Sequence, residues 1–108
     1  MKIKQISQLS EEQLIQKVKE SAIYIQYIKN PSEAVQSAAV NTYGCSIIFI
    51  KNPSEKIKLE AVNNNGYSLA YIKNPSKEVQ LAAVKQNPLA IHHIINPDQD
   101  VKDAAKCL

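Results

Sequence analysis

The sequence predicts an all-α fold made of short helical units that stack along one axis. Two observations lead to this class. The dipeptide Asn-Pro recurs every 22 residues, and the segments between its copies carry apolar residues at helical spacing. The copies begin at Asn30, Asn52, Asn74 and Asn96. Because a fixed period is typical of repeat architectures, we expect each unit to bury its apolar faces against its neighbours.

The period divides one domain, residues 1–108, into five units. We expect a capping unit over 9–30, repeats over 31–52, 53–74 and 75–96, and a capping half-repeat over 97–108. The capping unit aligns with the repeats only if a one-residue gap brings Leu14 under Val35. The two end units are the more polar ones, as the exposed ends of a stack require.

A longer helix is expected to open each unit. Asn can cap its N-terminus and Pro suits its first turn, which puts Glu33 and Glu55 at N3. In the first unit Ser10 is the cap, with Gln13 at N3, and the helix is expected over 11–20. Apolar residues then mark two sides of each later helix, as expected of a helix packed between two neighbours. They are Val35, Ile57, Val79 and Val101; Ala39, Ala61, Ala83 and Ala105; and Val40, Val62 and Val84.

A second, shorter helical segment follows in each unit. Gly44, Gly66 and Pro88 share one position of the period and break the first helix there. The segments over 46–50, 68–72 and 90–94 are short enough to be α or 3₁₀ helices, with apolar residues three apart facing inward. These are Ile47, Leu69 and Ile91, and Ile50, Ile72 and Ile94. A β-strand is the competing interpretation for 47–50, but the corresponding segments do not sustain the alternation, so helix is favoured.

The run Asn-Pro-Ser-x-x-Val-x-x-Ala-Ala-Val over 74–84 resembles the leucine-rich-repeat variant and, more loosely, HEAT-like repeats. The resemblance covers residues 9–108. It implies a right-handed α-solenoid with one α-helix and one short α or 3₁₀ helix in each unit, and a role as a binding scaffold. The chain departs from these families in its short unit, its scarcity of Leu, and the absence of Arg from a first-helix position where they often place it. That position holds Gln36, Lys58, Gln80 and Lys102.

Few residues could support catalysis or metal binding. His92 and His93 are adjacent, so on a helix they point about 100° apart and cannot readily share a metal ion. Cys45 shares its position in the period with Tyr67 and Leu89, which predicts a buried structural thiol. The two glycines are accounted for as helix breakers, which leaves no phosphate-binding loop. We therefore expect no enzyme activity, no catalytic residue, no metal and no cofactor.

The second segments offer the best candidate for a binding surface. When units stack, the residues that face away from the inward isoleucines should form three parallel ridges: one mixed, one aromatic and one mainly of lysine. They are Gln26, Ile48, Ala70 and His92; Tyr27, Phe49, Tyr71 and His93; and Lys29, Lys51, Lys73 and Ile95. Aromatic residues are frequent anchors of protein interfaces. The alternative is that the aromatic residues pack between repeats and the lysines only solvate the surface.

The expected function is therefore non-catalytic protein binding, with a protein partner of unknown identity. A narrower hypothesis, by analogy, is a small phage or mobile-element inhibitor of a host defence protein, such as an anti-CRISPR protein. The alternative is nucleic-acid binding through the Lys29/Lys51/Lys73 column, with the aromatic residues stacking on bases. The absence of Arg and a formal net charge of only +3 count against it.

A third hypothesis is self-association through Ile95 and the pair Cys107-Leu108, which leaves monomer and homodimer open. No apolar run approaches the roughly 18 residues of a membrane helix, and residues 1–10 lack the apolar stretch of a secretory signal. The two cysteines show no metal-ligand spacing. We expect an intracellular, cytoplasmic protein with no membrane partner.

Overall fold

The computed structural model describes residues 6–106, apart from the side chain of Ser7. This part of the chain is all-helical and contains no strand, which confirms the predicted class. α-Helices alternate with 3₁₀ helices (η): η1 Ile6–Gln8, α1 Glu11–Glu20, η2 Ala22–Tyr27, α2 Glu33–Thr42, η3 Gly44–Phe49, α3 Glu55–Asn64, η4 Gly66–Tyr71, α4 Lys77–Gln86, η5 Pro88–His93 and α5 Gln99–Lys106. None of these helices is long and apolar enough to cross a membrane.

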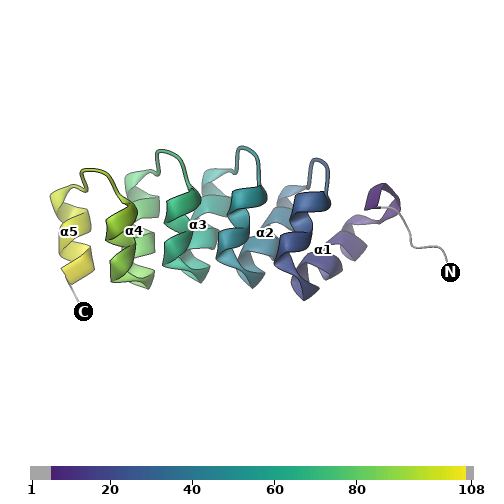
Figure 1. Cartoon of the computed structure of the whole chain (residues 1–108), viewed down its shortest axis with the longest axis horizontal. Coiled ribbons are helices and arrows are strands. Elements are labelled where there is room, and N and C mark those ends of the chain that lie inside the picture. The colour runs from purple at the N-terminus through teal and green to yellow at the C-terminus, as the bar shows by residue number, and fades with distance from the viewer. Residues whose placement is uncertain (1–5, 107–108) are drawn as a thin grey trace.

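The α-helices stand side by side in one layer, and the 3₁₀ helices η2–η5 form a second layer next to it (Figure 1). Each α-helix contacts the next in chain order, and each of these 3₁₀ helices contacts the next as well. The molecule is therefore elongated, with dimensions of 56 × 23 × 17 Å. Residues 22 positions apart in the sequence come to lie beside one another along the long axis.

The 22-residue period holds from Glu11 to the last described residue. α1 begins 22 residues before α2, so the capping unit needs no gap, and the predicted alignment of Leu14 with Val35 was wrong. Gln13 holds the position of Val35 instead. Its side chain accepts a hydrogen bond from the Ser10 backbone N–H at 2.9 Å, while the Ser10 hydroxyl accepts from the Gln13 N–H at 3.2 Å. This polar pair closes the N-terminus of α1, as the sequence predicted.

The asparagines of the Asn-Pro pairs are not N-caps, which corrects the prediction from the sequence. Each has a left-handed backbone, with φ between 47° and 54°. Asn tolerates this conformation better than most residues, and the turn it makes carries the chain from the 3₁₀ layer back to the α layer. The four are Asn30, Asn52, Asn74 and Asn96.

Serines two residues later cap the helices. The hydroxyl of Ser54 accepts a hydrogen bond from the backbone N–H of Ile57 at 3.3 Å. Ser32 and Ser76 cap α2 and α4 in the same way, and the Asp98 carboxylate accepts the corresponding N–H in α5. Glu33 and Glu55 are consequently the first residues of their helices rather than N3. A Ser hydroxyl and an Asn amide can both cap, so residue type alone does not decide between them.

The core lies between the two layers and along the helix contacts. Val and Ala of the α-helices are fully buried at Val40, Val62, Ala61 and Ala83, and the inward residues of η3 and η4 join them. The corresponding residues of η5, Ile91 and Ile94, are only half-buried. They have a single α-helix and no further 3₁₀ helix beyond them in the described part of the chain.

The first helices end at the predicted break, α2 at Thr42 and α3 at Asn64, and the two glycines that follow allow close packing. Gly44 and Gly66 are the first residues of η3 and η4, and neither has a positive φ. A Cβ on Gly44 would lie 2.4 Å from the carbonyl oxygen of Ala61, and one on Gly66 would lie 2.5 Å from that of Ala83. The α-helix of the following unit therefore packs directly against each glycine backbone.

Candidate binding face

The exposed apolar side chains gather on one layer of the molecule. Of the nine large hydrophobic residues that are exposed in the described part of the chain, eight lie in the 3₁₀ helices or at their ends, Ile95 lies in the turn after η5, and none lies in an α-helix. We call this surface the 3₁₀ face. It comprises the outward side chains of η2–η5, of the residues at their ends and of the turns that follow them, and its exposed large hydrophobic residues are Ile23, Tyr27, Tyr43, Ile48, Phe49, Tyr67, Tyr71, Leu89 and Ile95. Such a grouping is typical of an interaction surface, because scattered single residues are the rule elsewhere on proteins.

Charge is divided between the layers in the same way. All ten acidic residues of the chain fall in the α-helices or at their N-caps, and none falls in 21–31, 43–53, 65–75 or 87–97. The 3₁₀ face carries Lys29, Lys51 and Lys73, and the described residues offer none of them an ion-pair partner. The ion pairs that the described residues do form belong to the α-helices and their caps, as in Lys56–Glu60 at 2.6 Å. The 3₁₀ face is therefore both apolar and positive.

All twelve residues of the three predicted ridges are exposed. The aromatic ridge is 63% exposed at Tyr27, 40% at Phe49 and 49% at Tyr71. These rings are thus surface residues rather than core between repeats. Ile95, where the lysine ridge ends, is 90% exposed. Cys107 and Leu108, expected to form a self-association patch with Ile95, lie outside the described residues.

A fourth column of the 3₁₀ face was missed from the sequence. It contains Ile23, Cys45, Tyr67 and Leu89, one position in the period. The expected buried thiol is only half-buried in Cys45, and the other three side chains are exposed. A 3₁₀ helix has three residues per turn, so this column lies directly beside the mixed ridge, three residues further on. The sequence analysis missed this column because the predicted segments began one residue after it, at 46, 68 and 90, whereas η3, η4 and η5 begin at Gly44, Gly66 and Pro88.

The fourth column also contacts the next unit. The Tyr67 ring meets the His93 ring edge-on, with centroids 5.9 Å apart. Cys45 Sγ accepts from Asn65 Nδ2 at 3.8 Å and lies at the same distance from Ser68 Oγ, so the thiol contacts the next unit. The neighbouring Cys45 side chain, ahead of burial, raises the pKa of the Tyr43 phenol. The column thereby joins the ridges into one surface.

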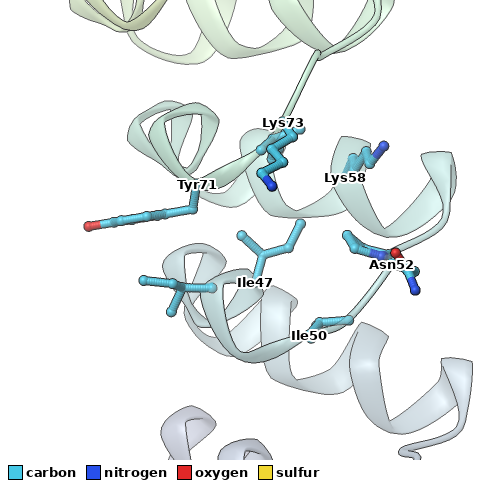
Figure 2. Close-up of a pocket in the computed structure, with 9 residues that line it drawn as sticks. Ile47, Ile50, Asn52, Lys58, Tyr71 and Lys73 are labelled. Carbon is cyan, nitrogen blue, oxygen red and sulfur yellow. The ribbon is translucent and has the colours of Figure 1, made fainter.

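Four hollows recur along this face in step with the period. Each lies where the Asn-Pro turn region of one unit meets its neighbour, and their volumes from the N-terminal end are about 470, 500, 390 and 380 Å³. Figure 2 shows the third, which we call the central hollow: Ile47 and Ile50 form its floor, while Lys73 reaches over it toward Ile47. The Tyr71 ring extends away from the other labelled residues. No carboxylate lines any of the four.

One lining position differs between the hollows. Gln36 and Gln80 each donate their side-chain amide to the carbonyl of the proline that opens their unit, Pro31 or Pro75, at 3.0 Å. The same position in the central hollow is Lys58, which is half-buried. The central hollow therefore combines two lysine side chains, from α3 and from the turn after η4.

Among residues 6–106, no group of three or more His, Cys, Asp and Glu side chains is placed to hold a metal ion. No protein-family model matches this chain, and comparison with curated proteins and with solved structures gives no match either.

Proposed function

We propose that this chain is a non-catalytic protein-binding module: a right-handed α-solenoid of 22-residue units that binds its partner through the 3₁₀ face. One observation carries the proposal. Every exposed large hydrophobic residue in the described part of the chain lies on this face, and none lies on the α-helices. Apolar side chains left in water cost free energy that a partner recovers by covering them.

The residue types on the face favour a protein partner. Tyr and Phe provide large contact area with few rotatable bonds, and interface hot spots are enriched in such residues. Tyr27, Phe49 and Tyr71 stand in one row with Ile48 beside them. In the α layer, by contrast, polar groups form hydrogen bonds between units, as between the Asn64 amide and the Asn41 carbonyl at 3.0 Å. These bonds stabilise the stack of units that carries the 3₁₀ face.

A narrower proposal rests on analogy alone. A small binding module without catalytic groups could act by covering a functional surface of another protein. A phage or mobile-element inhibitor of a host defence protein, such as an anti-CRISPR protein, would act in this manner.

Affinity purification with mass spectrometry tests the proposal. The tagged chain, treated with nuclease or untreated, should retain the same protein in both arms. Ile48→Asp combined with Tyr71→Ala should lose that protein, because the double change removes two apolar anchors. Asn63→Asp with Lys85→Ala, on exposed positions of the α layer, is the matched control and should retain it. A partner that survives the double change would refute the assignment to this face.

Nucleic-acid binding is the second candidate, favoured by the absence of carboxylates from the 3₁₀ face. Lys29, Lys51 and Lys73 would contact phosphates while the aromatic residues stack on bases. The affinity for a single-stranded oligonucleotide should then fall steeply with salt, and Lys51→Glu with Lys73→Glu should abolish binding. A flat titration at low salt would exclude it.

A further inference from the structure

We propose that the 3₁₀ face binds an extended, acidic segment of its protein partner, with every third side chain of that segment entering the next hollow. This inference rests on the proposed protein-binding function and specifies the chemistry of the partner. Three observations carry it: the recurrence of the hollows, their spacing, and the separation of charge between the two layers.

The spacing of the hollows matches that of an extended peptide. Packed helices lie about 8–10 Å apart, and five α-helices here follow one another along a molecule 56 Å long. A polyproline II segment advances about 9 Å in three residues and brings every third side chain to the same side. A β-strand advances about 10 Å over three residues, but its third side chain points to the opposite face. Side chains at positions i, i+3, i+6 and i+9 of an extended peptide in the polyproline II conformation therefore keep step with four successive hollows. A helical ligand would advance only about 4.5 Å over three residues.

The lining of the hollows indicates which side chains they accept. Lys29 lines the first hollow, Lys29 and Lys51 line the second, and Lys58 and Lys73 line the central one. No carboxylate of the chain itself neutralises these lysines among the described residues. A carboxylate of the ligand would neutralise them, and the isoleucine floor would contact the methylene groups of the side chain that carries it. A Glu side chain has both a carboxylate for the lysines and methylene groups for the isoleucines.

The last hollow differs from the other three. It is lined by His93, Ile94 and Ile95 and contains no lysine. An apolar side chain, rather than an acidic one, suits it. The ligand is thereby given a direction: acidic residues toward the N-terminal end of the molecule and an apolar residue toward the C-terminal end.

Lys58 is the residue that distinguishes the central hollow. In the neighbouring units the same position is a glutamine whose amide is closed onto a proline carbonyl, at Gln36 and at Gln80. Lys58 is half-buried, and a carboxylate of the ligand would stabilise its ammonium group. The change Lys58→Gln is accordingly a clean test, because two other units of this chain already fold with glutamine there.

Fluorescence anisotropy with the whole chain and labelled 12-residue peptides tests the inference. The register peptide has Glu at positions 1, 4 and 7 and Leu at 10, with Pro and Ala between them, and a second version reverses this order. The permuted peptide has the same composition with the three Glu adjacent. We expect the better register peptide to bind about tenfold more tightly than the permuted one, since three ion pairs contribute together.

Lys58→Gln should weaken binding of the register peptide about three- to fivefold, and Lys85→Gln, an exposed lysine of α4, should leave it unchanged. Equal affinities for register and permuted peptides would overturn the inference, as would an unaltered affinity in Lys58→Gln. Tighter binding of a single-stranded DNA oligonucleotide than of either peptide would overturn it as well. If the peptides fail while Ile48→Asp with Tyr71→Ala still loses the purified partner, protein binding stands and the extended acidic ligand falls.

Discussion

The Ser54 hydroxyl donates a hydrogen bond to the Glu33 carboxylate of the preceding unit, with 2.8 Å between Oγ and Oε2. The same hydroxyl accepts the N–H of Ile57, so one atom both caps α3 and ties it to α2. Equivalent bonds join Ser32 to Glu11 and Ser76 to Glu55. At the C-terminal end the chemistry changes: Lys77 takes the place of the glutamate and pairs with Asp98 and Asp100. A polar ladder thus runs along the N-terminal ends of the α-helices.

Ser54→Ala removes both bonds and should lower the free energy of unfolding by about 1–2 kcal/mol. Asn52→Gly should change it much less, because Gly adopts the left-handed conformation freely and no cap is lost. Urea denaturation of both variants gives the comparison. If Asn52→Gly were the more damaging of the two, asparagine rather than serine would be the effective cap.

Lys77→Glu should destabilise the C-terminal unit, because the new carboxylate faces Asp98 and Asp100. Adding Asp98→Ser rebuilds the Glu–Ser rung found between the other units and should recover part of the loss. Thermal unfolding of the single and double variants at low salt measures this. An unchanged melting temperature in Lys77→Glu would show that the ion pairs contribute nothing.

Gly66→Ala should destabilise the fold by about 1–3 kcal/mol, because its Cβ would press on the Ala83 carbonyl. Ala22 occupies this position in the first unit and is buried there. A small shift between units should therefore make room for the added Cβ and limit the loss of stability. Ala70→Ser, on the exposed side of η4, is the control for a change of one atom. Equal stability of Gly66→Ala and the native chain would mean that neighbouring units slide apart freely.

Ser68→Ala should lower the stability of the fold, whereas Ser46→Ala should not. Ser68 Oγ donates to the Ala61 carbonyl at 3.2 Å, and losing this buried bond costs about 1 kcal/mol. Ser46 Oγ is buried without a hydrogen-bond partner, so Ala should be neutral or stabilising by up to about 1 kcal/mol. Ala90 already occupies the same position in the last unit. Chemical denaturation of the two variants side by side decides the sign of each effect.

The stability of the fold should fall in acid partly through Glu60. Its hydrogen bond to Lys56, and then the one from Ser37, hold the pKa of this carboxyl below its usual value. A lowered folded pKa means a contribution that is complete above the unfolded pKa of about 4.3 and is lost as the pH falls through the folded pKa. Glu60→Gln should therefore lower the free energy of unfolding at pH 7. It should also reduce the difference in the free energy of unfolding between pH 7 and pH 3.5. Urea midpoints at both pH values, with Glu12→Gln as a control, test the sign.

Much of the candidate face could be predicted because the period assigns each residue to a column. The exposed ridges at Tyr27, Phe49 and Tyr71 followed from placing the isoleucines of each short segment inward. The column of Cys45 and Tyr67 could not be placed in this way, because the predicted segments began at 46 and 68, whereas η3 and η4 begin at Gly44 and Gly66. The start of a six-residue helix depends on its packing against the next unit.

The sequence by itself determined the helical class, the 22-residue period and the N-terminal capping box of Ser10 and Gln13, because these follow from spacing and local hydrogen bonding. Only the tertiary structure decided that Ser54 caps α3 while Asn52 turns the chain, since both residues can cap and the choice depends on backbone dihedrals. It likewise decided why Gly44 is glycine, because the Ala61 carbonyl that excludes a side chain there comes from the next unit. Packing between units, which a single unit does not encode, is the physical reason in both cases.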